Sequence, residues 1–244
     1  RPWDREATHQ LFDGLEFRVL RDRLLEALPN EEEIVPEGGF DLEAARLEPG
    51  ELASWLAEHA AGERTGVDII GHWGSGSGDV TALSLAAADG AAAYVVVSDL
   101  GPDDENALAD WLIDPEKHKA MHDAKGPLLA VWARGWDLAG LTSDTQLAAY
   151  LITPDQRTFD LADLTIRHLK RELRVEGAPD LDDPNQLALD FGDDDSGAKV
   201  AAEASMVRAR AVIDLADALD TEIEQRNATG DADHLTSERV RRQM

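Results

Sequence analysis

The stretch from Val67 to Val97 constrains the fold most, because three apolar segments of strand length follow one another there. These segments run from Gly66 to Trp73, from Asp79 to Ala88 and from Ala91 to Ser98. Short apolar runs bounded by turn residues are typical of buried strands. Asp89-Gly90 is a strong signal for a tight hairpin between the last two segments. We therefore expect consecutive antiparallel strands in the first half of the chain.

Helical patterns surround these strands. Helices are predicted over Asp4 to Leu28, from Pro49 through "PGELASWLAEHA", and over Pro102 to Ile113, Gly126 to Arg134, Phe159 to Glu172 and Lys199 to about Asn227. In "TSDTQLAAYLI", Ser143 or Asp144 would cap a helix whose buried face is Leu147, Tyr150 and Leu151. Lys119 to His122 is predicted to be a short strand. Strands and helices in this order indicate an α/β domain with a mixed sheet.

The glycine-rich run "GSGSGD" raises the possibility of a phosphate-binding loop. Such a loop needs a helix directly after the glycines, because the amides that hold the phosphate belong to the first helical turn. Val80 to Leu85 follows here and is predicted to be a strand, and Gly-Lys-Ser/Thr is absent. We therefore interpret the run as a β-turn.

The charge of the chain argues against a broad nucleic-acid-binding surface. Fifty acidic residues against 23 Lys and Arg give a formal net charge of −27. Nucleic-acid affinity depends on clustered cations, so we expect weak or no direct DNA binding. The chain has no cysteine, which excludes disulfides and thiolate metal sites. No apolar run is long enough to cross a membrane, and we expect a cytoplasmic protein.

The order of the elements resembles the 3′–5′ exonuclease-like domain of bacterial family A DNA polymerases, most closely the actinobacterial form of DNA polymerase I. The stretches that carry the resemblance are "LFDGLEFRVLRDRL", "GPDDENALADWLIDPEKHKAMHDAK", "GLTSDTQLAAYLITP" and "ARAVIDLADALDTEIE". The resemblance implies a ribonuclease H-like 3′–5′ exonuclease fold, with a mixed central sheet flanked by helices. It also implies that the parent protein is a DNA-directed DNA polymerase.

The resemblance implies a division of the chain as well. Residues 1–30 would be a connector helix that follows a 5′ nuclease domain, and 31–50 a linker. Residues 51–228 would be the exonuclease-like domain, with an acidic mobile loop at 175–198. Residues 229–244 form a polar tail that fits the family poorly. The expected partners are the polymerase and 5′ nuclease modules of the parent chain, between which this domain would be a structural spacer.

Active members of this exonuclease group hold two divalent metals with four carboxylates. Where the resemblance requires Asp-x-Glu, this chain has Gly71, His72 and Trp73, and Pro127 stands at a further Asp position. In the last helix Arg208 or a neighbour replaces the tyrosine, and Val212 or Ile213 replaces the acid. Since Gly, Trp, Pro and Ile cannot bind magnesium, we expect a vestigial domain without catalytic residues, metal or cofactor.

Two alternatives remain open. The first is an active metal-dependent 3′–5′ exonuclease that uses Mg²⁺ with acids such as Asp68, Asp79, Asp123 or Asp214. The second is a stand-alone interaction module. Its motif would be "QLALDF", which resembles the peptides that bind the bacterial sliding clamp, with Gln186, Leu187, Leu189 and Phe191 as contact residues. The same apolar side chains would also suit a loop that packs on its own domain.

Overall fold

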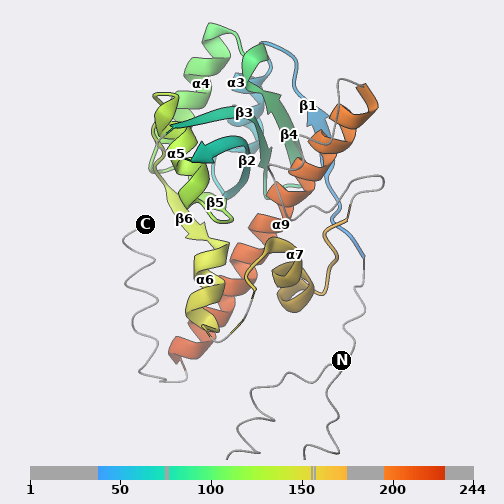
Figure 1. Cartoon of the computed structure of the whole chain (residues 1–244), viewed down its shortest axis with the longest axis vertical. Helices are drawn as coiled ribbons and strands as arrows, with labels where there is room; N and C mark the ends of the chain where they lie inside the picture. Colours follow the sequence, from blue (N-terminus) through green and yellow to red (C-terminus); the bar gives the residue numbers. More distant parts are fainter. Residues whose placement is uncertain (1–37, 75–76, 155, 157, 175–194, 229–244) are drawn as a thin grey trace, which may run out of the picture. The chain divides into compact units, whose positions relative to one another are not determined.

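A computed structural model describes residues 38–74, 77–154, 156, 158–174 and 195–228. In this part of the chain a six-stranded sheet has the order β1-β4-β3-β2-β5-β6 (Figure 1). Its strands are β1 (Glu43–Arg46), β2 (Thr65–Gly74), β3 (Ser77–Ala86), β4 (Ala91–Val96), β5 (Lys119–Met121) and β6 (Leu141–Asp144). β2, β3 and β4 are antiparallel neighbours, whereas β1 is parallel to β4, and β5 and β6 are parallel to β2 and to each other. The predicted mixed sheet is confirmed.

The two tight connections fall where the sequence predicts them. Ala87 and Ala91 close the turn between β3 and β4, and Gly90 in that turn has a φ of +99°, which favours glycine. The glycine-rich run joins β2 to β3, with Gly74 paired to Ser77. A strand therefore follows the glycines, and the helix N-terminus that a phosphate loop requires does not follow them.

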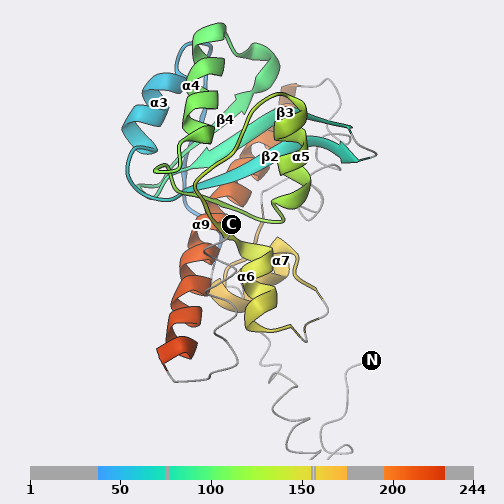
Figure 2. The same ribbon diagram turned by 90° about the vertical axis from the view of Figure 1, so that its left-hand side faces the viewer.

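Helices cover both faces of the sheet. They are α3 (Leu52–His59), α4 (Pro102–Ile113), α5 (Lys125–Ala133), α6 (Thr145–Ile152), α7 (Leu161–Leu164) and α9 (Asp195–Ala228), with a 3₁₀ turn at Val97–Asp99 and a π-helical turn at Thr165–Leu169. Helix α4 begins with Pro102 followed by three acidic residues, a sequence suited to a helix N-terminus. Helices α3, α4 and α5 pack on one face of the sheet (Figure 2).

Helix α9 packs on the other face. It contacts all strands from β1 to β5 and continues beside α6 and α7, as its orange and red ribbon shows in Figure 1. Strand β4 shows the two-sided core clearly. Ala93 and Val95 belong to the cluster under α3 and α4, whereas Ala92 packs against Ala209 and Ile213 of α9. A single helix thus packs along the sheet from β1 to β5.

Two helices differ from the sequence prediction. In α6 the buried residues are Thr145, Ala149 and Ile152 and not the predicted face of Leu147, Tyr150 and Leu151. Ala149 and Ile152 pack with residues of α9, while Tyr150 is 48% exposed. The predicted helix from Phe159 to Glu172 is shorter. It covers α7 and the π-helical turn and ends at Lys170, whose φ of +58° is left-handed and cannot continue a right-handed helix.

One further boundary lies close to its predicted position, and one strand lies where a linker was predicted. Helix α9 begins at Asp195, four residues before the predicted start at Lys199. The short strand β1 lies within the predicted linker and has an exposed surface. In the ranges that the structure describes, no helix is both long and apolar enough to cross a bilayer.

Candidate functional site

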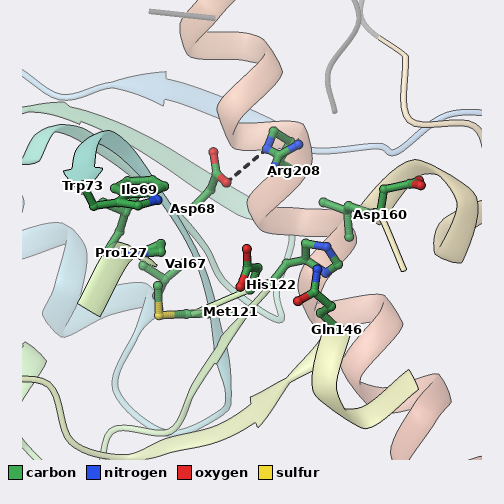
Figure 3. A pocket seen from close by; sticks show the side chains of 12 residues that line it. Val67, Asp68, Ile69, Trp73, Met121, His122, Pro127, Gln146, Asp160 and Arg208 are labelled. Carbon is green, nitrogen blue, oxygen red and sulfur yellow. Dashed lines mark hydrogen bonds and ion pairs between the residues drawn. The ribbon is translucent and has the colours of Figure 1, made fainter. Parts of the chain in front are cut away.

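A pocket of about 130 Å³ opens where the end of β5 meets β2, α5, α6 and α9 (Figure 3). Apolar side chains form much of its wall, and charged or polar groups converge from β2, the loop after β5, α6, the start of α7 and α9. The lining residues are Val67, Asp68, Ile69, Trp73, Met121, His122, Asp123, Pro127, Gln146, Asp160, Leu161 and Arg208. The polar ones among them determine what the pocket can do chemically.

The most buried charges of the pocket are Asp68 on β2 and Arg208 on α9. Nε of Arg208 lies 3.1 Å from Oδ1 of Asp68, and Oγ of Ser205 donates a hydrogen bond of 2.8 Å to Oδ2. Asp68 is 8% exposed, Arg208 4% and Ser205 0%. Ser205 and Arg208 are three residues apart and so share one face of α9. Both carboxylate oxygens of Asp68 are therefore engaged by α9.

The sheet allows α9 to come this close because Gly66 lacks a side chain. A Cβ at Gly66 would collide with the backbone oxygen of Ala209. Gly66 and Asp68 point to the same face of β2, since residues two apart in a strand do so. Gly66 therefore lets α9 approach β2, and Asp68, two residues further along the strand, contacts the helix.

His122 follows β5 and faces the same pocket. Its Nδ1 forms a 2.8 Å hydrogen bond with Oγ1 of Thr145, the first residue of α6. Burial, together with the nearby charge of Arg208, lowers the pKa of His122 to about 3. The imidazole is therefore neutral at pH 7 and adds no positive charge to the pocket.

One carboxylate holds the loop beside His122. Asp144 accepts hydrogen bonds from the backbone N–H groups of Asp123 and Ala124, at 3.2 and 2.9 Å, and from those of Gln146 and Leu147, at 3.1 and 3.3 Å. Of the two residues predicted as the α6 cap, Asp144 is the one that caps it. Burial raises its pKa, against the effect of these hydrogen bonds. The contacts place Asp123 at the pocket with a φ of +48°.

Trp73 closes the pocket at the end of β2. Its indole packs against Gly126 so closely that a Cβ at that position would overlap the ring. Pro127, the next residue of α5, is buried and lines the pocket beside it. Trp73 and Pro127, two of the residues predicted to stand in place of metal ligands, therefore contribute an aromatic ring and a pyrrolidine ring to the pocket wall.

The other degenerate positions lie elsewhere. Gly71 is buried against the backbone of Asp79 across the hairpin, and His72 is exposed. Ile213 is buried between α9 and the sheet, where it packs with Ala209 and Ala92. The structure therefore brings Trp73 and Pro127 into the pocket, whereas Gly71, His72 and Ile213 do not line it.

Of the four acids proposed for a residual nuclease, two line the pocket and two do not. Asp68 and Asp123 line the pocket. Asp79 lies 3.7 Å from Arg134, and Asp214 forms ion pairs with Arg171 and Arg210, at 2.9 and 2.8 Å. The proposed clamp-binding residues Gln186, Leu187, Leu189 and Phe191 lie outside the described residues.

The donor set of the pocket does not fit a two-metal centre. Asp68 is bound by Arg208 and Ser205, and Oδ1 of Asp160 accepts the N–H of Asp163 at 2.8 Å as the cap of α7. Among the residues that the structure describes, no three His, Cys, Asp or Glu side chains are grouped so that they could hold a metal ion. Two metals held by shared carboxylates need a denser set of oxygen ligands.

Sequence reasoning missed the central role of the Asp68–Arg208 pair. The two residues are 140 positions apart, and Arg208 was only aligned with a tyrosine of the active relatives. A usable signal was present: Asp68 interrupts the apolar run "VDII", and Arg208 stands among small apolar residues of α9. A charge in an otherwise buried segment usually has a buried partner.

Comparison with known proteins relates the chain to the ribonuclease H-like domain of DNA polymerase I. The family described as DNA polymerase I, ribonuclease H-like domain, matches residues 79–177. The DNA polymerase I of Mycobacterium tuberculosis is 49% identical over 230 residues, which are 94% of this chain and 25% of that protein. This chain thus spans about a quarter of the length of the curated relatives it matches.

Solved structures agree with this assignment. One described as the POL domain of Pol1 from M. smegmatis in complex with DNA primer-template and dNTP is 45% identical. The TM-score is 0.62, and the match covers 75% of this chain and 28% of the solved chain. Escherichia coli RNase D, described as an exoribonuclease involved in structured RNA processing, is 15% identical with a TM-score of 0.56, over 82% of this chain and 51% of that one. At this identity the second likeness supports the fold alone.

Proposed function

Because the chain belongs to the family of 3′–5′ exonuclease-like, ribonuclease H-like domains of DNA polymerase I, we propose that it has kept the fold of the exonuclease and lost two-metal hydrolysis. Its role would be architectural, within a polymerase that acts in DNA replication and repair. The observation that carries this proposal is the buried pair of Asp68 and Arg208 in the pocket.

The chemistry of phosphodiester hydrolysis explains why this pair matters. One metal ion activates the water and the second stabilises the leaving oxygen, so both must be bound by carboxylates that are free to ligate. The guanidinium of Arg208 cannot lose its proton in a protein and keeps its positive charge beside Asp68. A fixed cation at Oδ1 and the hydroxyl of Ser205 at Oδ2 therefore occupy both oxygens that Asp68 could offer to a metal.

The remaining groups of the pocket do not replace what is missing. His122 is neutral at pH 7 and forms a hydrogen bond with Thr145. A lone imidazole is a poor ligand for a hard cation such as Mg²⁺. Trp73 and Pro127 have no oxygen to offer from their side chains. The proposed function therefore requires neither Mg²⁺ nor another cofactor.

A nuclease assay tests the loss of hydrolysis. The purified chain is incubated with a 3′-labelled single strand of DNA in Mg²⁺ or Mn²⁺, beside an Asp68→Asn, Asp123→Asn double variant. We expect the same background in both samples. Metal-dependent trimming from the 3′ end that the double variant lacks would overturn the proposal in favour of a residual exonuclease.

The spacer role follows from the place of such domains in longer chains. About three quarters of the length of a curated relative lies outside the aligned segment. A domain that acts by contact needs an exposed apolar surface, and the outer face of α5 has one. Leu129 is 47% exposed and Trp132 52%, and the two are three residues apart on the helix. We assign this face to the contact with the polymerase module.

Limited proteolysis of the full-length polymerase tests that contact. Leu129→Ser with Trp132→Ser should speed cleavage between this domain and the polymerase module. Ile113→Ser on α4 is the matched control, because Ile113 is 51% exposed and lies on another helix. Equal cleavage rates in the α5 variant, the control and the unchanged protein would overturn the assignment of this surface.

A further inference from the structure

We propose that the basic residues after the π-helical turn form a contact surface for the phosphate backbone of DNA. This basic patch consists of Lys170, Arg171 and Arg174, together with Arg210 of α9. The proposal rests on the place in a DNA polymerase proposed above, but not on the loss of hydrolysis. It gives the domain a binding surface that an architectural role alone does not require.

Lys170 has a backbone conformation that is unfavourable for lysine. Its φ of +58° and ψ of +29° are left-handed, at the residue that ends the π-helical turn. Glycine is the usual residue in this conformation, because a Cβ makes it costly. The turn before it, Thr165–Leu169, is π-helical, a rare geometry that is frequent at functional sites. A lysine kept under backbone strain at such a turn points to a role for its side chain.

The side chains that follow the turn are exposed and incompletely neutralised. Nζ of Lys170 donates to the backbone oxygen of Arg167 at 3.1 Å, and no ion pair among the described residues involves Lys170. Arg174 lies 3.0 Å from Glu172, but its side chain is 75% exposed. An ion pair so open to solvent contributes little. Both cations are therefore available to an anionic partner.

Arg171 and Arg210 share a single acid. Oδ2 of Asp214 lies 2.9 Å from Arg171, and Oδ1 lies 2.8 Å from Arg210. One negative charge thus stands against two positive ones and holds both guanidinium groups in place. Arg171 also lies over the ring of Phe40, 5.5 Å from its centre. Side chains already held in this way lose less conformational entropy when they bind a partner.

A polyanion fits this patch. Grouped Lys and Arg bind the phosphates of DNA and release its counterions. In the polymerase proposed above, DNA is the polyanion that the domain meets. The net charge of −27 confines such a contact to a local patch and makes it weak and sensitive to salt. The acidic sequence 175–194, which follows Arg174 directly, is the competing occupant.

Fluorescence anisotropy of a labelled DNA duplex, titrated with the chain in EDTA between about 50 and 200 mM KCl, tests the proposal. We expect a weak complex whose affinity falls steeply with salt. Lys170→Gly and Arg174→Gln should each weaken binding about tenfold at the lowest salt and reduce the salt dependence by about one phosphate contact. Lys125→Gln removes an exposed cation at the start of α5 and is the matched control, which should bind like the unchanged chain.

Lys170→Gly also separates a role in binding from a role in the fold. Glycine relieves the left-handed strain, so this variant should raise the Tm by about 2 °C while it weakens DNA binding. Arg174→Gln should leave the Tm unchanged, because its side chain is exposed. A lower Tm for Lys170→Gly would mean that the lysine is kept for the fold and would overturn the proposal.

Three further outcomes would also overturn it. The first is a Lys170→Gly variant that binds DNA like the unchanged chain. The second is an equal loss of affinity in Lys125→Gln, which would show a general effect of net charge. The third is an unchanged chain that binds no DNA at the lowest salt, which would favour residues 175–194 as the occupant of the patch. Because EDTA excludes metal ions here, the nuclease assay in Mg²⁺ or Mn²⁺ tests the loss of hydrolysis separately.

Discussion

Oδ2 of Asp144 accepts the backbone N–H of Ala124 at 2.9 Å, although the two residues are 20 positions apart. Ala124 immediately precedes α5, and Asp144 itself caps α6. One carboxylate therefore binds at the start of two helices, and the loop with His122 and Asp123 leads from β5 into the first of them. The carboxylate of Asp144 thereby holds the loop that contributes His122 and Asp123 to the pocket wall.

Asp144→Ala should destabilise the domain by about 2–3 kcal/mol, since it removes a helix cap and leaves buried N–H groups without an acceptor. Asp144→Asn should lose less, because the amide oxygen still accepts. Urea unfolding monitored by far-UV circular dichroism gives both values. An alanine variant within 0.5 kcal/mol of the unchanged chain, about the effect of an ordinary surface change, would show that Asp144 has no such role.

His122 should make the stability depend on pH below neutrality. Its pKa is about 3 in the folded chain, against an ordinary value of 6.5. Between these values the unfolded chain binds the proton more readily, so the contribution of His122 is complete above pH 6.5 and is lost as the pH falls toward 3. The slope should reach about 1.4 kcal/mol per pH unit.

Urea unfolding at pH 4, 5, 6 and 7 measures that slope. His122→Gln should reduce it, because glutamine does not titrate and its amide can still bond to Thr145. The exposed His72→Gln is the control and should leave the slope unchanged. Parallel pH profiles for all three proteins would contradict the assignment of the titration to His122.

Gly126→Ala should destabilise the chain by about 2 kcal/mol, because the added Cβ overlaps the Trp73 ring. The same change in a Trp73→Ala background should be neutral or stabilising by up to about 1 kcal/mol, since alanine favours a helix over glycine. A double-mutant cycle by chemical unfolding measures the difference. Equal effects in the two backgrounds would mean that Trp73 does not rest on Gly126.

Lys119→Met should cost about 3 kcal/mol, because the fully buried ammonium group joins three separate backbone carbonyls. Nζ donates to the oxygens of Asp114, Lys117 and Ala139 at 3.1, 2.7 and 3.0 Å, and lies 4.5 Å from the centre of the Trp111 ring. Thermal unfolding tests this, with the exposed Lys125→Met as control. A Tm equal to that of the control would contradict the prediction.

The clamp-binding motif remains a prediction from the sequence. If "QLALDF" binds a sliding clamp, Leu189→Ala with Phe191→Ala should weaken binding at least about tenfold, since such peptides are held by a few apolar anchors in a groove. Surface plasmon resonance against the purified clamp measures this. A chain that binds no clamp before mutation would exclude the motif.

Local patterns predicted most of the elements, because strands and helices show a short-range periodicity of apolar residues in the sequence. The β3–β4 hairpin, α4 and the α6 cap depend on residues within one turn of one another. The helix predicted at α7 was too long, since no pattern in the sequence indicates that Lys170 adopts a left-handed conformation. The predicted buried face of α6 was wrong, because it depends on which side of α6 meets α9, a helix that begins 43 residues after α6 ends.

The candidate site was predicted less well than the fold. Trp73 and Pro127, two of the positions aligned through the resemblance, line the pocket, but a linear alignment cannot show that Gly71 and Ile213 do not. The pair of Asp68 and Arg208 joins a strand to a helix across 140 residues. Such a contact exists only once the tertiary structure has formed.

Helix α9 also limits how this part of the chain can change over generations. It brings Ser205 and Arg208 to Asp68 and Ile213 to the sheet within an uninterrupted run of 34 residues. An inserted or deleted codon within that run would turn everything beyond it by about 100°. Related domains should therefore have insertions and deletions in their loops. Within α9 they should differ by substitutions alone. A length change inside α9 would be tolerated only if it came close to a whole number of turns.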